Sequence, residues 1–281
     1  MSRKTITTAE IAAFAAHLRA AEKSPATVAK YTRVAKGFAA FLNGAPWSFA
    51  RAVAYKRQLG AAGLGTRSVN GAVAALNALF AFLGHGEERL KTLRLQRKVY
   101  RPQEKELTRA EYARLCQAAG TKGDRQLSLI LQTICGTGIR VSELEFITTE
   151  AVRRGVAVVR CKAKTREVFL VPSLQKKLLR YLEKRNIHHG CVFRSRGGKP
   201  LCRTTVWRKM KSLCRAAGVP WGKVFPHNLR HLFARVFYDL DKDIVKLADL
   251  LGHSSINTTR IYIIGTGEEH RRRMEQMHLI L

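Results

Sequence analysis

Apolar residues recur every three or four positions through the first ninety residues, which predicts a run of short amphipathic helices. Thr8 is expected to cap the first helix, and Ser24 followed by Pro25 is typical of the start of the second. Asn43-Gly44 is expected to end that second helix, because both residues tolerate a left-handed backbone. The four predicted helices lie near residues 11–22, 25–42, 49–59 and 67–83. Residues 1–95 are therefore predicted to form a small helical bundle.

Helical periodicity is lost after this bundle. Residues 84–106 are dense in charge and carry one proline, a composition typical of a solvated linker. We expect the linker itself at 96–106 and a second domain at 107–281. Its last part, residues 263–281, is expected to form a C-terminal tail.

The second domain combines helical and extended patterns. Helices are predicted near residues 108–119, 126–135, 174–184 and 204–217. Between the second and third, the stretch GVAVVRCKAKTREVFLVP alternates β-branched and polar residues around a polar centre. This pattern predicts a hairpin with its turn near Ala163–Arg166. The predicted fold class is mainly α, with a small helical bundle followed by a mostly α domain that holds a small antiparallel β element.

The charge of the chain indicates its partner. Its 281 residues include 51 Lys and Arg against 20 Asp and Glu, a formal charge of +31. Residues 1–103 carry 17 basic and 4 acidic residues, and the remainder carries 34 and 16, so both halves favour an extended polyanion such as duplex DNA. No segment approaches the ~20 apolar residues of a membrane span, and the N-terminus lacks a signal-peptide core. We expect a cytoplasmic protein with no membrane partner.

Five short segments hold polar residues that neither a core nor a plain surface requires. In GTGIRVSEL, Arg140 follows two glycines and Glu143 lies about one helical turn further on. The alternative for this pair is an ordinary surface ion pair. In the hairpin, Lys162, Lys164 and Arg166 are expected to project from the turn, where a basic side chain is more often simply solvated.

The third segment, FPHNLRHLFAR, places His227 and Arg230 on one face near a helix N-terminus, a position that favours phosphate. His227 and His231 also have the HxxxH spacing of zinc hydrolases, but Asn228 stands where such an enzyme has its glutamate base. None of the six cysteines forms a CxxC pair or shows metal-ligand spacing. In a cytosolic chain they are expected to be reduced thiols, so we predict no metal and no disulfide.

The last two segments lie together in LGHSSINTTRIY. Gly252-His253 ends an apolar helix, and Tyr262 follows nine residues after His253 in a new short helix. Taken alone, such a tyrosine is more often a core-edge residue with a wet hydroxyl. Taken with the other segments, it completes a set suited to phosphoryl transfer. Planar guanidinium groups match the charge that develops on phosphodiester oxygens, a lysine protonates the leaving alkoxide, and a tyrosine attacks.

In this order and near these intervals, GTGIRVSEL, the hairpin lysine, HNLRH and LGHSSINTTRIY resemble the motifs of the tyrosine recombinases, also called the phage integrase family. The resemblance covers the whole chain and implies a SAM-like, core-binding helical domain ahead of a catalytic domain. The catalytic residues that it implies are Arg140, Lys162, His227, Arg230, His253 and Tyr262. The arginines would clamp the scissile phosphate with help from the histidines, the lysine would be the general acid and the tyrosine the nucleophile. Glu143 would brace Arg140.

The hairpin departs from the family pattern. Members often read G-K-G-x, whereas this chain reads Cys161-Lys162-Ala163-Lys164. Lys164 is therefore an alternative general acid. We favour Lys162, because it directly follows the predicted strand and keeps the family's approximate distance from Arg140.

The resemblance also implies a function. The protein would be a site-specific DNA recombinase or integrase that acts through a 3′-phosphotyrosyl intermediate without cofactor, metal or ATP, to integrate or excise a mobile element. The alternatives are a chromosome-dimer resolvase, a type IB topoisomerase-like enzyme and a catalytically idle DNA-binding protein. The implied partners are double-stranded DNA and further copies of the chain, from dimer to tetramer. An accessory DNA-bending or directionality protein is compatible with this picture.

The tail carries an apolar stripe formed by Met274, Met277, Ile280 and Leu281. A short helix cannot bury such a stripe alone. The stripe is expected to dock either on its own domain or, as the family implies, on a neighbouring protomer in a tetrameric synapse.

Overall fold

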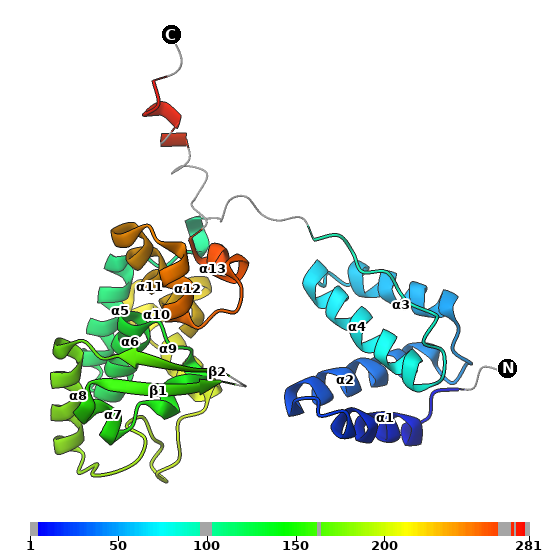
Figure 1. Cartoon of the computed structure of the whole chain (residues 1–281), viewed down its shortest axis with the longest axis horizontal. Helices are drawn as coiled ribbons and strands as arrows, with labels where there is room; N and C mark the ends of the chain where they lie inside the picture. Colours follow the sequence, from blue (N-terminus) through cyan, green and yellow to red (C-terminus); the bar gives the residue numbers. More distant parts are fainter. Residues whose placement is uncertain (1–4, 96–102, 162–163, 264–270, 273, 279–281) are drawn as a thin grey trace. The chain divides into compact units, whose positions relative to one another are not determined.

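The computed structural model in Figure 1 describes residues 5–95, 103–161, 164–263, 271–272 and 274–278. The chain divides into two compact units between Arg97 and Lys98. The first is entirely helical over its described residues, and the second is mostly helical with one two-stranded sheet. Each unit has its own hydrophobic core. The predicted mainly α fold class is confirmed.

Four helices form the first unit: α1 (Thr8–Ala20), α2 (Pro25–Leu42), α3 (Phe49–Ala61) and α4 (Thr66–Phe82). Ser24 caps α2, with proline at its first position, and Asn43 ends it at a φ of 47°, as predicted. The cap of α1 was predicted one residue too late. Thr7 accepts the backbone N–H of Glu10, and the Glu10 carboxylate accepts that of Thr7. This reciprocal capping box requires threonine and glutamate three positions apart, a spacing that Thr8 lacks.

The second unit begins with the short 3-10 helix η1 (Gln103–Lys105) and continues through a longer series of elements. These are α5 (Arg109–Thr121), α6 (Arg125–Thr137), η2 (Val141–Phe146), α7 (Thr149–Arg154), β1 (Val156–Cys161), β2 (Lys164–Phe169), α8 (Pro172–Lys184), α9 (Arg203–Lys211), α10 (Cys214–Ala217), η3 (Trp221–Lys223), α11 (Pro226–Asp241), α12 (Ile244–Leu251) and α13 (Ile256–Ile263). The single helix expected at 204–217 is in fact broken into α9 and α10. Ser212 lies at the break, where its hydroxyl donates to the carbonyl of Lys209, a bond that competes with a continuous helix.

The β hairpin is shorter at its tip than predicted. Strands β1 and β2 are antiparallel and stay paired as far as Cys161 and Lys164, so only positions 162 and 163 connect them. The turn predicted at Ala163–Arg166 is therefore wrong for positions 164–166, which belong to β2. Arg166, for example, pairs with Val159 inside the sheet. The alternation of inward and outward side chains continues through Arg166 of β2. The side chain of Arg166 forms an ion pair with Glu143, described below.

The core of the second unit gathers the inner faces of its helices and sheet around fully buried residues such as Leu115, Ile130, Val159, Leu178 and Val206. A smaller cluster joins α11, α12 and α13 through Ala234, Leu247, Leu251 and Tyr262. That cluster fixes the last two helices against α11 (Figure 1). Within the described ranges, no helix has both the length and the apolar character that crossing a bilayer requires.

Candidate active site

Arg140 and Glu143 form a connected pair just beyond the end of α6. Gly138 ends that helix with a φ of 68°, and an added Cβ there would collide with the ring of Phe233, so the position requires glycine. Glu143 accepts the backbone N–H of Arg140 at 2.8 Å and its Nη1 at 2.7 Å. Because Glu143 is only 2% exposed, this is not an ordinary surface pair.

A second arginine, Arg166 of β2, holds the same carboxylate. Its Nη1 and Nη2 donate to the two oxygens of Glu143 at 3.2 and 2.7 Å. Burial alone would raise the pKa of Glu143, but the hydrogen bonds from Arg166 and Arg140 outweigh it and lower the pKa. Glu143 is therefore ionised at neutral pH and orders two guanidinium groups around one carboxylate.

Arg230 of α11 lies beside this pair and is almost completely buried, with 1% of its surface exposed. Its Nη1 donates to the carbonyl of Gly138 at 2.5 Å, and its Nη2 donates to the carbonyl of Leu251 at 2.7 Å and to Nε2 of His253 at 2.9 Å. Within the described residues it has no ion-pair partner, and its Nε makes no hydrogen bond. Burial, followed by the charge of Arg140, lowers the pKa of Arg230 to about 10, so it remains a cation at neutral pH.

Among the described residues, the hydrogen bonds that hold this buried cation go to neutral groups. Burying a charge costs free energy unless an opposite charge or good hydrogen bonds compensate. Glu143 already serves Arg140 and Arg166. The cluster therefore carries three guanidinium groups for one carboxylate, an excess that suits an incoming phosphate anion.

His253 follows Gly252, which ends α12 at a φ of 64°. Since a guanidinium only donates, Nε2 of His253 must accept from Arg230, and Nδ1 must then carry the proton. Nδ1–H donates to the hydroxyl of Thr259 at 2.8 Å. Burial, and then the charges of Arg230 and Arg140, lower the pKa of His253 to about 4, so the ring is neutral at physiological pH.

Tyr262 is supplied to the same cluster by α13. Its hydroxyl shares a hydrogen bond with Nε2 of His227 at 3.1 Å, and its ring stacks on His231 with centroids 4.2 Å apart. The guanidinium carbon of Arg230 lies 5.8 Å from the centre of the tyrosine ring. Tyr262 is 5% exposed. It is therefore not a core-edge residue with a wet hydroxyl, because that hydroxyl faces an imidazole inside a cationic cluster.

The structure thus brings five of the six predicted residues together: Arg140, His227, Arg230, His253 and Tyr262. The sixth, Lys162, lies outside the described residues. Lys164 starts β2, and its side chain also lies outside them. The choice between these two lysines as general acid stays a prediction.

The arrangement gives the zinc alternative little support. His227 bonds Tyr262, and among the described residues the one group of three or more candidate metal ligands is His85, Glu87 and Glu88 of the helical unit. His227 and His231 therefore have no third ligand beside them in this part of the chain. We identify no cofactor-binding residue in the cluster.

Sequence reasoning missed three residues of the site: Arg166, His231 and Thr259. Arg166 gave no sequence signal for pairing, because Glu143 lies 23 positions away and only the fold brings the two side chains together. His231 was considered only as a zinc ligand, while its i, i+4 relation to His227 also places it on the face that meets Tyr262. Thr259 lacked any signal, because its role depends on the tautomer of His253.

Arg166→Gln is expected to slow the DNA cleavage that the family resemblance implies roughly 10²-fold, the scale of loss for a misplaced catalytic group. The substitution frees one side of Glu143 and lets Arg140 shift. The measurement is the single-turnover cleavage rate at saturating DNA, with thermal unfolding recorded in parallel. Arg160→Gln, on the exposed face of the neighbouring strand, is the matched control and should cleave at the wild-type rate.

A double-mutant cycle with Glu143→Gln separates positioning from general destabilisation. Because Arg166 acts through Glu143, the two losses should be strongly non-additive. Arg166→Lys should be intermediate, since an ammonium cannot bridge both carboxylate oxygens. Fully additive losses, or a wild-type rate for Arg166→Gln, would contradict this role.

Comparison with known proteins agrees with the geometry. The profile of the Phage integrase family matches residues 105–267. Tyrosine recombinase XerA of Pyrococcus furiosus is 32% identical over 289 residues, covering 100% of this chain and 98% of the relative. XerA of Thermococcus kodakarensis is 35% identical over 278 residues, covering 95% and 94%. The fold is similar to that in a crystal structure of a lambda integrase dimer bound to a COC′ core site, with a TM-score of 0.73, 20% identity and coverage of 93% of this chain and 78% of that one.

Proposed function

Because the chain belongs to the phage integrase family of tyrosine recombinases, we propose that it cuts and rejoins specific duplex DNA sites through a 3′-phosphotyrosyl intermediate on Tyr262. One observation carries this assignment. The Tyr262 hydroxyl lies in the same cluster as Arg230, a buried guanidinium that no carboxylate neutralises among the described residues. A nucleophile and an anion-seeking cation are thus preorganised together.

The chemistry proceeds as an exchange of phosphodiester bonds. The Tyr262 oxygen attacks the scissile phosphorus while its proton passes to Nε2 of His227, and the bond from phosphorus to the 5′ oxygen breaks. Lys162, or alternatively Lys164, protonates the departing 5′ oxygen. Arg140 and Arg230 bind the non-bridging oxygens as their charge grows, and neutral His253 keeps Arg230 aligned. A 5′-hydroxyl from another duplex reverses these steps, so the bond energy is conserved without ATP.

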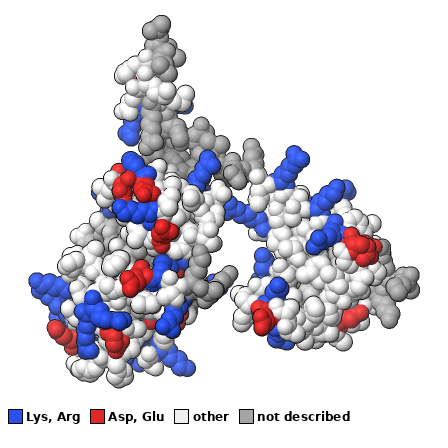
Figure 2. Space-filling view, in the orientation of Figure 1, with Lys and Arg blue, Asp and Glu red and all other residues white. Residues whose placement is uncertain are grey.

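The distribution of charge supports duplex DNA as the partner. Figure 2 shows Lys and Arg side chains over the visible face of both units, with fewer acidic ones among them. Residues 184–238 contain 13 Lys and Arg and not a single Asp or Glu. This segment runs from the end of α8 to α11 and so leads directly into the candidate site. A long acid-free segment that ends in the helix of His227 and Arg230 suits contact with the phosphate backbone.

Two exposed tryptophans lie within that segment. Trp207 of α9 is 40% exposed and Trp221 of η3 is 59% exposed, and their rings meet edge to face at 6.0 Å. The Nζ of Lys211 lies 4.6 Å from the centre of the Trp221 ring. Exposed aromatic rings beside cations are typical of surfaces that contact nucleic acid. We propose that this pair contacts the bound DNA.

Target DNA is therefore expected to quench the tryptophan fluorescence of the protein. The third tryptophan, Trp47, is buried in the helical unit against Phe80 and should respond little. In a titration, Trp207→Phe/Trp221→Phe should lose most of the quenching, while Trp47→Phe should keep it. Quenching that persists in the double variant would contradict this contact.

We further propose that the protein integrates or excises a mobile element and assembles as a tetramer on DNA. The family supports the first point, and the exposed Met274 and Met277 support the second, because a short apolar segment favours burial against another copy.

A plasmid assay tests this proposal. Supercoiled plasmids would carry two different candidate sites, two identical copies of one site, or no site. An integrase should recombine the unlike pair, whereas a chromosome-dimer resolvase should act on identical copies only. A topoisomerase-like enzyme should relax every plasmid without recombination, and an idle binder should leave all three unchanged. Deletion of residues 268–281 should abolish recombination in the unlike pair if the tail joins protomers.

A further inference from the structure

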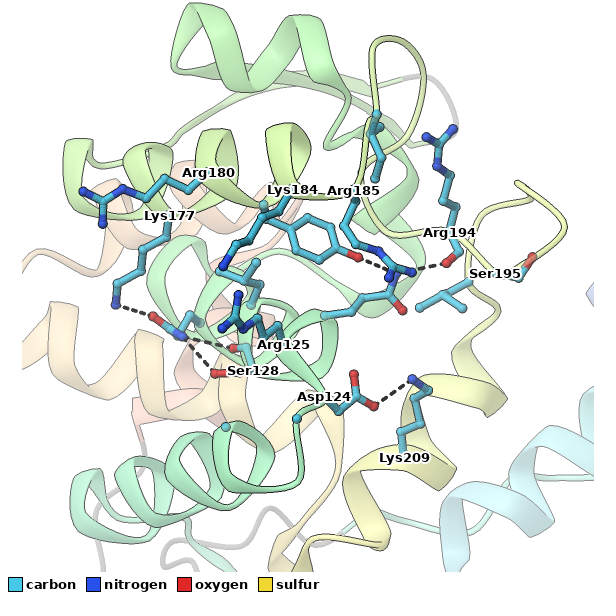
Figure 3. Close-up of a pocket in the computed structure, with 18 of the residues that line it drawn as sticks. Asp124, Arg125, Ser128, Lys177, Arg180, Lys184, Arg185, Arg194, Ser195 and Lys209 are labelled. Carbon is cyan, nitrogen blue, oxygen red and sulfur yellow. Dashed lines mark hydrogen bonds and ion pairs between the residues drawn. The ribbon is translucent and has the colours of Figure 1, made fainter.

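A large basic hollow lies in the second unit, away from the candidate active site (Figure 3). It has a volume of about 1580 Å³ and is formed by α6, α8, the segment around Arg194 to Gly198 and one side of α9. Among the described residues, its lining contains nine Lys and Arg and two acids, Asp124 and Glu183. None of the described site residues, from Arg140 to Tyr262, is among those that line it.

Most of these basic side chains form no ion pair within the part of the chain that the structure describes. Asp124 already pairs with Lys209 at 2.8 Å, and Lys177 donates to the side-chain carbonyl of Gln132 at 2.7 Å. Among the described residues, six lining cations make no side-chain hydrogen bond or ion pair: Arg125, Arg180, Lys184, Arg185, Arg194 and Arg196. In Figure 3, Arg125 from α6 and Lys184 from α8 extend from opposite walls into the same space. Like charges facing one another across a hollow repel unless an anion lies between them.

Hydrogen bonds connect the walls of the hollow to one another. The side-chain amide of Gln126 donates to the hydroxyl of Tyr181 at 3.1 Å and to the carbonyl of Arg194 at 2.9 Å. These bonds tie α6 to α8 and to the segment that carries Arg194 and Arg196. The basic side chains therefore extend from segments that are hydrogen-bonded to one another.

The position and size of the hollow indicate the class of ligand. It runs along α6 from Arg125 to Gln132, whereas the C-terminal end of that helix leads to Gly138, whose carbonyl binds Arg230. The 13 residues of α6, at 1.5 Å each, place Arg125 about 20 Å from Gly138. The volume exceeds the roughly 300–1,000 Å³ typical of pockets that enclose a small molecule. A chain of phosphates fits both the charge and the extent better than one small anion does.

We propose that this hollow is a second phosphodiester-binding site, which holds DNA backbone remote from the phosphate that Tyr262 attacks. The inference rests on the proposed function for the identity of the polyanion. Its contacts strengthen binding and help to set the position of the duplex, but they take no part in the chemistry.

The test compares two variants that lose the same charge. Arg125→Gln/Lys184→Gln neutralises facing walls of the hollow, and Arg154→Gln/Lys176→Gln neutralises exposed residues of α7 and α8 outside it. Dissociation constants for a long duplex would be measured across a salt series. The hollow variant should bind more weakly and show a salt slope smaller by about 2, because two phosphate contacts are lost. The control variant should change much less.

A second measurement locates the contact. Neutral methylphosphonate linkages, placed one at a time along the duplex, should weaken wild-type binding at phosphates remote from the cut, and those effects should disappear in the hollow variant. Its covalent adduct yield at saturating DNA should equal that of the wild type. Equal salt slopes and equal methylphosphonate profiles for the two variants would overturn the proposal. So would weaker binding of an acidic peptide with unchanged DNA binding, which would reveal a different occupant.

These outcomes are separable from the proposed function. If the wild type formed no adduct on any site, the proposed recombinase function would be rejected. The salt and methylphosphonate data would still test whether the hollow binds DNA backbone. If the adduct formed normally and the hollow variant matched its control, only this inference would fall.

Discussion

Tyr262→Phe is expected to bind target DNA like the wild type and to form no covalent adduct. The substitution keeps the ring that stacks on His231 and packs near Arg230, so the fold of α13 should survive. It removes the hydroxyl and with it the bond to His227, a loss of about 0.5–1.5 kcal/mol in stability. The measurement is a nicked duplex that traps the cleaved state, resolved on a denaturing gel, with binding followed separately by gel shift.

Tyr238→Phe provides the control for this experiment. Tyr238 lies on α11, packs against the same small apolar cluster as Tyr262 and contacts Lys242. Its substitution should leave the adduct intact. An adduct that forms with Tyr262→Phe, or that disappears equally with Tyr238→Phe, would show that Tyr262 is not the nucleophile.

Arg230→Lys is expected to slow cleavage by at least about 10² to 10³, the usual cost of losing one preorganised electrostatic group. The lysine side chain keeps the positive charge but lacks the planar guanidinium group with its several N–H donors. It cannot reach the carbonyls of Gly138 and Leu251 and the ring of His253 at once. The phosphate would then meet a misplaced cation, and His253 would lose the contact that fixes its tautomer. The measurement is the single-turnover cleavage rate at saturating DNA.

Folding must be monitored in this second experiment. Removing the guanidinium leaves buried carbonyls without donors, at about 1–3 kcal/mol each, so thermal unfolding accompanies each rate. Arg154→Lys, on the surface of α7, should behave as the wild type in both measurements. A rate for folded Arg230→Lys within about threefold of the wild type would remove Arg230 from the mechanism, because a clamp of this geometry tolerates no such exchange.

Local sequence signals predicted most of the fold. Ser24-Pro25 and Asn43 begin and end α2 because caps act through neighbouring residues alone. The break between α9 and α10 was missed, since it depends on the Ser212 hydroxyl reaching a carbonyl three residues back. The hairpin turn was misplaced because Arg166 looks like a solvated turn residue until Glu143, 23 positions away, is brought beside it.

The candidate site was predicted through its motifs, and the family resemblance that they suggested is confirmed by the match over residues 105–267. Spacing along the chain could not reveal the contacts that cross elements. The bond from Arg230 to the carbonyl of Gly138 spans 92 positions, and the stacking of His231 on Tyr262 requires α11 and α13 to meet. The basic hollow likewise has no sequence motif, because its walls come from separate helices that only the fold assembles.

The most direct test of the central claim is to locate the covalent bond. The trapped adduct would be digested with protease and nuclease, and the peptide that carries the residual nucleotide would be sequenced by mass spectrometry. We predict a single modified residue, Tyr262, joined to a 3′-phosphate with a free 5′-hydroxyl on the released strand. A nucleotide attached to another residue, or a linkage through a 5′-phosphate, would contradict the account.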